Sequence, residues 1–391
     1  MKPVISYLDT KCTHCIKCLK SCPMDAISIV NHQVNIDESK CIHCDVCIQN
    51  CPSRVLKVQS AHMNETMKNR QYNIALIPTS LLSDMKSYED FQRICQAILE
   101  LGFDEIEQYS DIEGYLYNKA IEESHQKPGL WLTSFCPTIN QLIEKNYPTL
   151  YDRILPYDYP VEIAARRIRK KHQGQDVGIY SLCECVGKMM LAKEPFGNME
   201  SAIDYAMTIS HVFPKINKLK SNQKYPIEMN REGVKSNVED LFGNRSMSIV
   251  RVEGLNQSRS LLDLIEFDQI QHIDLVAMFA CYQGCIGGYY LWSNPFEGSY
   301  NIESMMEQYT LSDLQLNDEE YRVHRQLDHQ EMLSMKERMA WFAKVNDILE
   351  LLPQYDCGAC GFANCRSLAQ SIVDHKVDIQ VCRVRKKGDE K

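Results

Sequence analysis

Several features that would assign this chain to a common class are missing from its 391 residues. No apolar run is long enough to span a membrane, and the first segment, MKPVISYLDTKC, has no apolar signal region before its cysteine. Basic residues do not predominate, because the formal net charge is -9 and Lys and Arg are mostly interleaved with Asp and Glu. These absences argue against a membrane span, a secretory signal and a nucleic-acid-binding surface, and we expect a cytoplasmic protein.

No phosphate-binding glycine loop and no nucleotide-binding fingerprint stands out either. Cysteine, in contrast, is abundant, with 18 residues. Since a cytoplasmic protein keeps its thiols reduced, we expect metal ligands rather than a disulfide framework.

The cysteines divide the chain into three expected domains. Residues 1–62 hold eight of them, and the polar stretch 61–72 holds none, as in a linker. Residues 70–352 alternate apolar runs with helical patterns, which predicts an α/β domain with largely parallel sheets. From Pro353 the composition is rich in cysteine again, so 353–391 is expected to form a small helical domain.

The first domain contains two runs with the spacing C-x2-C-x2-C-x3-C-P, separated by a hairpin-like segment at 26–37. This is the run of bacterial two-cluster ferredoxins, in which three cysteines of one run hold a 4Fe-4S cluster and the fourth ligates the other. His14 and His43 are expected only to form hydrogen bonds near the clusters. Two zinc knuckles are the alternative, which the repeated spacing disfavours. The predicted ligand sets are Cys12, Cys15, Cys18 and Cys51 for one cluster, and Cys41, Cys44, Cys47 and Cys22 for the other.

The last domain has four cysteines with the spacing C-x2-C-x4-C-x16-C. Four thiolates suit zinc or an iron-sulfur cluster. The pattern resembles the small 4Fe-4S domain of corrinoid iron-sulfur proteins and of an ion-translocating ferredoxin oxidoreductase subunit, which favours a cluster. The predicted ligands are Cys357, Cys360, Cys365 and Cys382.

Three apolar runs of the middle domain, 129–135, 177–182 and 273–280, lead directly into a cysteine. In open α/β sheets ligand sites gather at the carboxyl ends of strands, so these strand ends can converge on one site. Strand ends that merely happen to hold cysteine are the alternative. Cys95, on an amphipathic segment, is expected to be plain core. The cysteines that follow the runs are Cys136, Cys183, Cys281 and Cys285.

Three segments, TSFCP, SLCECVGK and FACYQGCIGG, resemble in order and spacing the signatures of the FeFe-hydrogenase catalytic domain. With the ferredoxin runs in front, the resemblance covers nearly the whole chain and implies an α/β domain with parallel sheets in two lobes. It also implies an H-cluster, in which a 4Fe-4S cubane is joined to a two-iron subcluster. Cys136, Cys183 and Cys281 would hold the cubane, and Cys285 would ligate it and bridge to the two irons.

The residues around these ligands depart from the signatures of hydrogen-producing members. Phe135 stands where a proton-passing cysteine is usual, and Val186 where a lysine usually pairs with a cyanide, so that Lys188 or a backbone amide would have to replace it. Ser181 and Phe279 stand where methionines usually pack against the two irons. Such changes tune a metal site rather than remove it. They resemble the divergent, sensory-type branch of the family.

The resemblance implies an anaerobic iron-sulfur oxidoreductase that interconverts dihydrogen with protons and electrons, slowly or for sensing. Its redox partner would be ferredoxin or another iron-sulfur enzyme, and a signalling partner is expected because the chain ends soon after Cys382. Beside the ligands, Glu184, Cys185 and Tyr282 are the candidate proton carriers, and Cys285 is counted with them as catalytic.

Two other functions stay open at this point. One is an electron-transfer or assembly protein with a cubane but no two-iron subcluster. The other is a reductase that binds a different substrate in a pocket lined by Phe135, Tyr282 and Tyr289.

Overall fold

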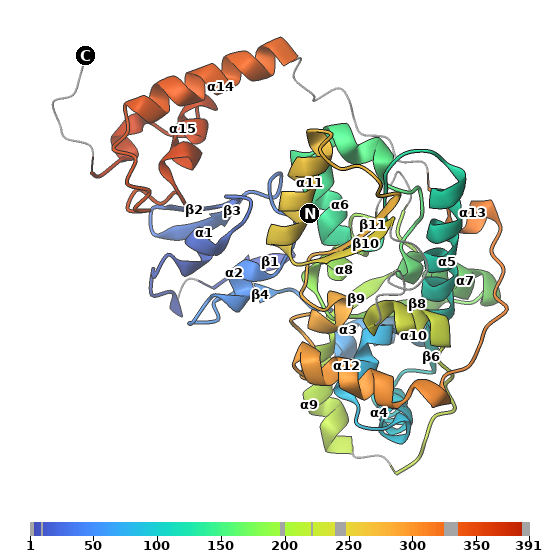
Figure 1. The fold of residues 1–391 in the computed structure, drawn as a ribbon. Coiled ribbons are helices and arrows are strands. Elements are labelled where there is room, and N and C mark those ends of the chain that lie inside the picture. Colours follow the sequence, from blue (N-terminus) through green and yellow to red (C-terminus); the bar gives the residue numbers. More distant parts are fainter. Residues whose placement is uncertain are drawn as a thin grey trace. The chain divides into compact units, whose positions relative to one another are not determined.

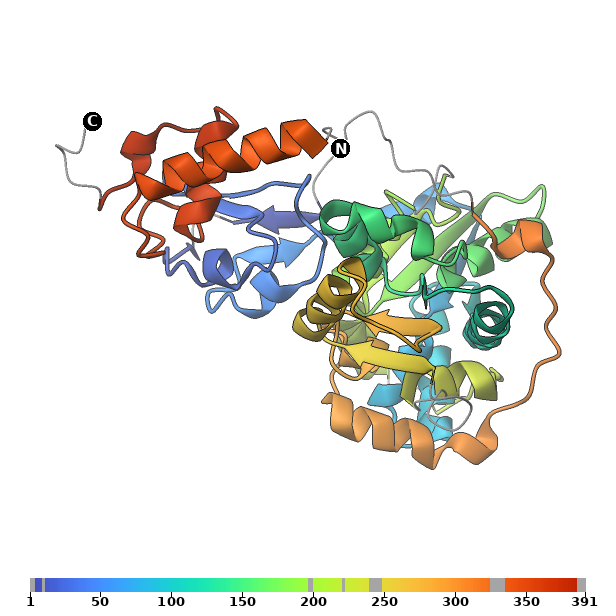
Figure 2. The ribbon, with the colours of Figure 1, turned by 45° about the horizontal axis from the view of Figure 1, so that its top comes forward.

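The two ends of the chain fold together, apart from its middle. Residues 1–59 and 327–391 form the first unit, here called the terminal unit, and residues 60–326 form the second, the central unit. Figures 1 and 2 show the computed structural model of the chain as a ribbon. The structure describes residues 4–8, 11–195, 200–219, 222–238, 248–323 and 335–384.

Two small antiparallel sheets frame the N-terminal cysteine runs. The first pairs β1 with β4 and the second pairs β2 with β3. The β2–β3 hairpin confirms the one expected at 26–37, and its turn residues Asn31 and His32 both have positive φ, as a two-residue type I′ turn requires. The elements are β1 (Ile5–Tyr7), α1 (Lys17–Ser21), β2 (Ile27–Val30), β3 (Gln33–Ile36), α2 (Val46–Gln49) and β4 (Leu56–Val58).

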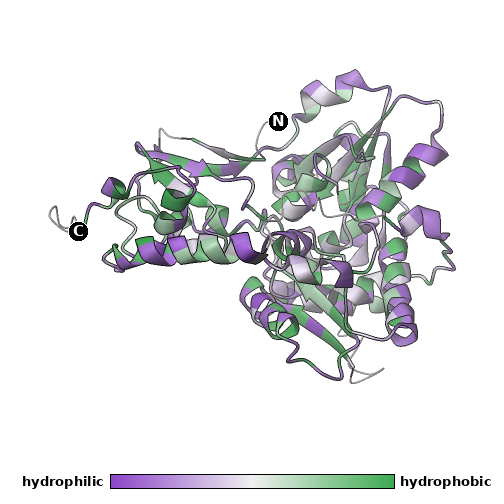
Figure 3. Cartoon of the chain, turned by 90° about the horizontal axis from the view of Figure 1, so that it is seen from above, coloured by the Kyte–Doolittle hydropathy of each residue, from purple (hydrophilic) through white to green (hydrophobic). Residues whose placement is uncertain are grey.

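The C-terminal part of the terminal unit is helical, as expected. It contains α14 (Met335–Glu350), α15 (Cys365–Val373) and the 3-10 turn η8 (Ile379–Val381). The helices α14 and α15 pack together over a small apolar core, so the boundary expected at residue 352 falls inside this module rather than at its edge. Both helices carry hydrophilic and hydrophobic segments in Figure 3, as helices with one buried face do. The core residues are Val345, Leu352, Phe362, Leu368 and Ala369.

The central unit is built on two parallel sheets, which confirms the predicted α/β class. One sheet has the order β6-β5-β8-β9 and the other the order β10-β11-β7, and every pairing in both is parallel. The strands β5, β8 and β11 are almost entirely buried and largely apolar, as strands are when helices cover both faces of a parallel sheet. The strands are β5 (Tyr72–Ile77), β6 (Glu105–Gln108), β7 (Trp131–Leu132), β8 (Val177–Cys183), β9 (Tyr205–Thr208), β10 (Ile249–Glu253) and β11 (Leu275–Phe279).

Helices connect the strands of the central unit. The α-helices are α3 (Met63–Thr66), α4 (Tyr88–Glu100), α5 (Ser110–Gln126), α6 (Pro137–Asn146), α7 (Pro160–Lys171), α8 (Val186–Leu191), α9 (Ile209–Leu219), α10 (Arg231–Val238), α11 (Leu255–Glu266), α12 (Pro295–Ser304) and α13 (Asp318–Tyr321). Five 3-10 turns accompany them: η2 (Met67–Asn69), η3 (Thr79–Asp84), η4 (Pro148–Arg153), η5 (Gly284–Gly287) and η6 (Met306–Gln308). Within the described part of the chain, none of the helices combines the length and the apolar character needed to cross a bilayer.

Local sequence explains where α4 begins and ends. The Ser87 hydroxyl accepts a hydrogen bond of 3.1 Å from the backbone N–H of Asp90, which satisfies a donor that the first turn would leave free. The helix ends before Gly102, whose φ of +109° suits a helix terminus. Cys95 on this helix is fully buried, which confirms that it is core.

The expectation that the stretch 61–72 is a linker is wrong, because most of it is helical. It forms α3 and η2, and Met63 packs into the main core of the central unit with only 3% of its surface exposed. The stretch is polar overall, but Met63 and Met67 pack against the core and hold it in place.

Candidate metal centres

The structure gathers the first predicted ligand set of the terminal unit. Burial, together with the nearby charges of Cys51, Cys15 and Cys12, raises the pKa of the Cys18 thiol to about 11, which indicates that the four sulfurs are neighbours. Cys51 comes from the second run, so the crossing of one cysteine between runs follows the expected ferredoxin pattern.

The second set is gathered in the same way. Burial, together with nearby charges that include those of Cys22 and Cys41, raises the pKa of Cys44 to about 12. Burial also raises the pKa of Cys47, beside Cys44, Cys41 and Cys22. A buried group of thiols resists losing its protons unless a cation offsets the negative charge, and this is what the irons of a cluster provide.

The two runs repeat their backbone as well as their spacing. His14 and Ile16 in the first run have φ of 52° and 56°, and the matching His43 and Asp45 in the second have 54° and 66°. Positive φ is uncommon for residues other than glycine, and least favourable for a β-branched residue such as Ile16. Strain repeated at equivalent positions indicates that both loops are folded for the same purpose, to turn their sulfurs inward.

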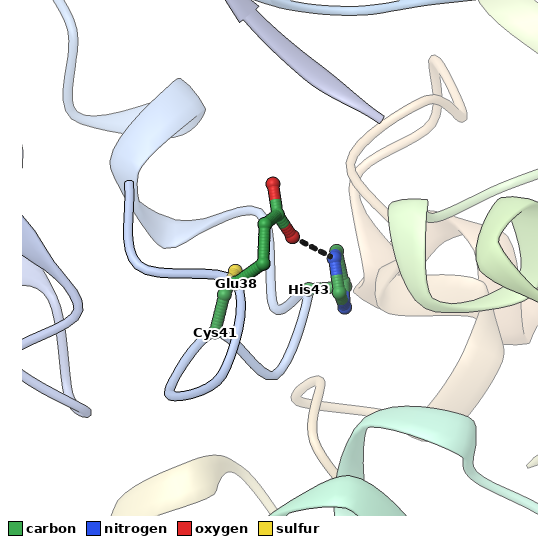
Figure 4. Close-up of side chains that lie close together, drawn as sticks. All are labelled: Glu38, Cys41 and His43. Atoms are coloured by element: carbon green, nitrogen blue, oxygen red, sulfur yellow. Dashed lines mark hydrogen bonds and ion pairs between the residues drawn. The ribbon is translucent and has the colours of Figure 1, made fainter. Parts of the chain in front are cut away.

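Glu38, Cys41 and His43 also lie close together, with ligand atoms within 4.8 Å of one another (Figure 4). Cys41 belongs to the second predicted set, and His43 Nε2 lies 3.2 Å from Glu38 Oε2. His14 likewise uses Nε2, at 2.8 Å from the His32 carbonyl oxygen. Both histidines therefore form hydrogen bonds beside the sulfurs, as expected.

The four C-terminal cysteines line one small cavity of about 10 Å³. Burial raises the pKa of Cys360, and the charges of Cys382 and Cys357 add to it. The backbone N–H of Cys365 donates a 2.6 Å hydrogen bond to Asp356 Oδ1, which holds the start of α15 against the cysteine loop. The set predicted from spacing is thus assembled within one module.

In the central unit the three cysteine segments meet at the ends of strands. Cys136 follows β7, Cys183 ends β8, and Cys281 follows β11. Burial raises the pKa of Cys183 to about 12, and the Ser181 hydroxyl lies 3.4 Å from its sulfur. The carboxyl ends of strands from both sheets therefore contribute to the site, as the position of the apolar runs predicted.

Two close contacts join the first segment to the third and to the second. Burial raises the pKa of Cys136, while a hydrogen bond from the backbone of Ala280 lowers it, which brings the first segment beside the third. A Cβ on Gly187 would lie 2.6 Å from Thr138 Oγ1, so the second segment packs on the first with no space between them.

The glycines of the third segment serve the packing of the protein itself. A Cβ on Gly287 would lie 2.0 Å from the Tyr282 carbonyl oxygen, and one on Gly288 would lie 2.7 Å from Glu184 Cγ. The Tyr290 N–H also donates to the Glu184 carbonyl oxygen at 3.0 Å. The loop that carries Cys285 is thereby held against the segment that carries Cys183.

A cavity of about 30 Å³ lies beside Cys285. Its walls are mostly aromatic and aliphatic, with a few polar groups directed to one place, as in ligand sites generally. Phe135 in its wall stacks on Tyr117, with ring centroids 4.5 Å apart. The lining residues are Tyr109, Glu113, Tyr117, Phe135, Pro137, Tyr159, Pro160, Val161, Lys188, Leu191, Ser236, Phe279 and Cys285.

Lys188 brings a buried positive charge to this cavity. Its Nζ lies 2.6 Å from Glu184 Oε1 and 3.2 Å from the Tyr109 hydroxyl. Burial lowers the pKa of Lys188, but the attraction of Glu184 and Tyr109 outweighs burial and holds that pKa well above its usual value. The ammonium group therefore stays charged in the same cavity that Cys285 lines.

The three predicted proton carriers lie in different surroundings. Glu184 is 1% exposed, and its Oε2 has no hydrogen-bond partner among the residues that the structure describes. The Cys185 sulfur accepts a 3.4 Å hydrogen bond from the Lys188 N–H at the start of α8. Tyr282 is 55% exposed and does not line the cavity. Only Glu184 lies in the buried ion pair.

The cavity residues that sequence reasoning missed include Tyr109, which contacts Lys188, and the pair Glu113 and Tyr117. The two residues of the pair lie four residues apart on α5, so they share one face of that helix and reach the site from a segment without cysteine. Glu113 is 8% exposed. The i, i+4 spacing of a carboxylate and an aromatic residue is the only signal in the sequence, and it is common on helices that have no site.

Three family models match parts of the chain. Residues 79–224 match the iron only hydrogenase large subunit, C-terminal domain. Residues 4–68 match the 4Fe-4S dicluster domain, and residues 352–384 match a family of Fe-S cluster domains. The hydrogenase match ends before the segment that holds Cys281 and Cys285. No curated protein is significantly similar to the chain in sequence.

Similar solved structures include hydrogenases. HydA(deltaEFG), described in a study of stepwise FeFe-hydrogenase H-cluster assembly, is 14% identical with a TM-score of 0.48, over 65% of this chain and 94% of its own. A variant of FeFe-hydrogenase HydA1 from Chlamydomonas reinhardtii is 13% identical with a TM-score of 0.49, over 65% and 94%. An apo variant of HydA1 from the same organism is 14% identical with a TM-score of 0.49, over 68% and 96%.

Proposed function

We propose that this chain belongs to a divergent FeFe-hydrogenase-like family with an N-terminal ferredoxin domain. On this premise, it interconverts dihydrogen with protons and electrons slowly, at a rate suited to sensing. Its iron-sulfur domains fit an oxidoreductase that receives electrons from another iron-sulfur protein. A signalling partner and a cytoplasmic location belong to the same proposal.

The proposed cofactors are four 4Fe-4S clusters and one two-iron subcluster. Two clusters belong to the N-terminal runs and one to the C-terminal cysteines, with the ligand sets given above. In the central unit, Cys136, Cys183, Cys281 and Cys285 would hold the cubane, and Cys285 would bridge to the two irons. The two-iron subcluster, when bound, would supply an open iron position at which dihydrogen is split or formed.

The observation that carries the proposal is the position of Lys188. Its ammonium group lies in the cavity beside Cys285, although the residue expected for this role, at position 186, is a valine. A fixed buried cation fits a cofactor that bears anionic ligands, because an ammonium group held inside the protein forms a stronger charge-assisted contact than one in water. Glu184 and Tyr109 hold this ammonium in place.

The remaining residues of the cavity would exclude water and limit proton supply. Phe135 and Tyr117 cover one wall as a stacked pair. Phe135 has no proton to pass, so the route that a thiol would provide at that position is missing. Glu184, 2.6 Å from the Lys188 amine, is the one of the three predicted carriers that lies in the buried ion pair, where it is the counter-ion of Lys188. Slow turnover follows from a site with charge but a poor proton route.

One observation favours a second function, that of an electron-transfer or assembly protein with a cubane alone. The cavity beside Cys285 measures only about 30 Å³, room for groups of the size of water, since Phe135 and Tyr117 fill the rest. The third function, a reductase with an aromatic pocket, receives less support. Tyr282 and Tyr289 are 55% and 40% exposed and do not line the cavity.

Infrared spectroscopy tests the choice between the first two functions. The protein would be matured anaerobically with the hydrogenase assembly proteins, and its iron content measured. We expect bands of iron-bound carbonyl and cyanide. If the bands are absent and the iron content equals that of four cubanes, the two-iron subcluster and the hydrogen chemistry are both wrong, and the cubane-only function replaces them.

A hydrogen-deuterium exchange assay then tests the proton route. Phe135→Cys should raise the exchange rate over that of the unchanged protein, because a thiol replaces a side chain that cannot titrate. Phe135→Ser is the matched control, because it opens the same space with a group whose proton is far less acidic. Equal rates for both variants would mean that space, not proton transfer, limits turnover.

A further inference from the structure

The C-terminal cluster module lies against the first cysteine run of the ferredoxin module within the terminal unit. Both ribbon views show α15 beside α1, β2 and β3 (Figures 1 and 2). Four kinds of contact join them among the described residues: a lysine on backbone carbonyls, an aspartate on side-chain donors, a backbone hydrogen bond at a sheet edge, and an ion pair of Lys376 Nζ with Asp37 Oδ2 at 3.5 Å. None of these contacts belongs to a ligand set, yet all lie within a few residues of one.

Lys20 provides the first contact. This residue of α1 lies between Cys18 and Cys22, and its Nζ donates to the carbonyl oxygens of Asp356 and Ala363. These two carbonyls flank the loop that carries Cys357 and Cys360. One ammonium group therefore joins a ferredoxin helix to the C-terminal cysteine loop, in a charge-assisted contact stronger than that of a neutral donor.

Asp25 provides the second contact. Its Oδ2 accepts hydrogen bonds from Asn364 Nδ2 at 2.9 Å and from the Ser367 hydroxyl at 2.7 Å. Asn364 caps the N-terminus of α15, where a negative charge is favourable. Asp25 itself has φ of 48°, so its backbone is held in an uncommon conformation that presents the carboxylate.

The third contact closes the free edge of β2. The Ile29 N–H, on the side of β2 away from β3, donates to the Gly361 carbonyl oxygen at 2.8 Å. A Cβ on Gly361 would lie 2.0 Å from the Ile29 carbonyl oxygen, so only glycine permits this approach. An edge strand that pairs with a loop of another module is a specific contact, because its donors and acceptors must match in register.

The contacts bring ligands of two clusters close to each other. A Cβ on Gly358, next to Cys357, would lie 3.3 Å from Ile16 Cδ1. Ile16 in turn follows Cys15. The Ile16 side chain therefore lies beside Gly358, and only these two residues stand between Cys357 of the C-terminal set and Cys15 of the first ferredoxin set.

We infer that the C-terminal cluster exchanges single electrons directly with the cluster held by Cys12, Cys15, Cys18 and Cys51, through the contact of Gly358 with Ile16. The inference rests on the cofactors of the proposed function. If both clusters are bound, one electron would pass from the reduced C-terminal cluster, which would become oxidised, to the oxidised ferredoxin cluster, which would become reduced, with no bond made or broken. A reduced low-potential iron-sulfur protein outside the chain supplies the next electron. The C-terminal cluster and the ferredoxin clusters would then share one electron path within the terminal unit.

Lys20→Glu in the full-length, cluster-loaded protein tests the contact. The new carboxylate would face two carbonyl oxygens, and the module should open. We expect the Ile29 amide to exchange with deuterium roughly tenfold faster, the change that loss of a charged hydrogen bond produces. Lys17→Glu is the matched control, since it makes the same charge change on an exposed residue of the same helix and should leave the rate unchanged. Ser367→Ala, on the other side of the contact, should give a smaller increase.

Electron paramagnetic resonance of the reduced protein tests the electron step. Two reduced clusters that lie close together broaden each other's signals. Lys20→Glu should move the clusters apart and so sharpen the signal of the C-terminal cluster, whereas Lys17→Glu should not. The Leu8 amide, which donates to the Val55 carbonyl oxygen within the ferredoxin module at 3.0 Å, serves as the internal control for folding. It should stay protected in every variant.

The outcomes separate this inference from the proposed function. Iron and sulfide content below that of three cubanes in the terminal unit would contradict the proposed cofactors. Full content with an unchanged Ile29 exchange rate in Lys20→Glu would overturn the contact. Faster exchange with an unchanged resonance signal would overturn the direct electron step.

Discussion

In the terminal unit, each ferredoxin set takes three of its four cysteines from a stretch of seven residues, and the C-terminal set lies on one small module. The four cysteines of the central unit, in contrast, come from separate segments between Cys136 and Cys285. The two ferredoxin sets are framed by loops with a repeated, uncommon backbone, in which φ is positive at equivalent residues. The central set lies beside a buried lysine, a buried glutamate and a wall of aromatic rings. Cysteine spacing alone can define a site that only carries electrons, while a site for chemistry also needs surroundings that a whole domain must assemble.

The largest expected effect separates the two kinds of site outright. Cys183→Ala removes one central ligand and should lose the central cubane with all hydrogen turnover, while the three clusters of the terminal unit remain. Total iron should fall by about one quarter or, with a two-iron subcluster also lost, somewhat more. Iron analysis and electron paramagnetic resonance measure the change. The control is Cys95→Ala, a fully buried cysteine outside every set, which should keep its iron. Equal iron loss in both would show that core damage, not ligand loss, empties the site.

The next effect concerns the charges of the central site. Lys188→Met leaves Glu184 buried without its counter-ion and should destabilise the central unit by about 3–5 kcal/mol, as measured by urea unfolding. Adding Glu184→Gln to the same chain should restore much of the loss. Lys119→Met is the control, because it breaks an ion pair on the surface, with a Glu122 side chain that is 60% exposed. It should lower the free energy of unfolding by less than about 1 kcal/mol. Similar losses for the two lysines would contradict a buried ion pair at Lys188.

A smaller effect concerns pH. Glu162, fully buried on α7, accepts hydrogen bonds from the Ser201 hydroxyl at 2.6 Å and the Ala202 N–H at 3.0 Å. Burial raises its pKa from 4.5 to about 7. Because the folded protein then binds a proton more tightly than the unfolded chain, this contribution to stability is full below pH 4.5 and is lost as pH rises through 7.

Between those pH values the free energy of unfolding should fall by up to about 3 kcal/mol on account of this group. Glu162→Gln should flatten that part of the profile, which urea unfolding at a series of pH values would measure. A profile as steep as that of the unchanged protein would mean that Glu162 is charged in the fold at neutral pH.

Cysteine spacing and apolar runs predicted much of this architecture. The run 177–182 corresponds to β8, and 26–37 to the β2–β3 hairpin. The run 129–135 predicts a longer strand than the structure has, because only Trp131 and Leu132 pair with β11 before the chain turns toward Cys136. Apolar character marks a buried segment but does not say how many of its residues join a sheet.

The surroundings of the central site were harder to predict because they depend on direction and on distant segments. Tyr282 was chosen because it follows Cys281, yet it lies in a turn that faces its side chain outward. Lys188 was one of two possible substitutes for a missing lysine, and its place depends on the pitch of α8. Glu113 and Tyr117 come from a helix without any ligand, so no motif could select them.

The hydrogen bond between Ile29 and Gly361 has a consequence for any shortened form of the chain. Without the C-terminal module, β2 would present an unsatisfied row of backbone donors and acceptors to the solvent. Such an edge is a template for pairing with the same strand of another molecule. A chain cut before residue 335 should therefore self-associate, and its behaviour would report on aggregation rather than on the loss of a cluster.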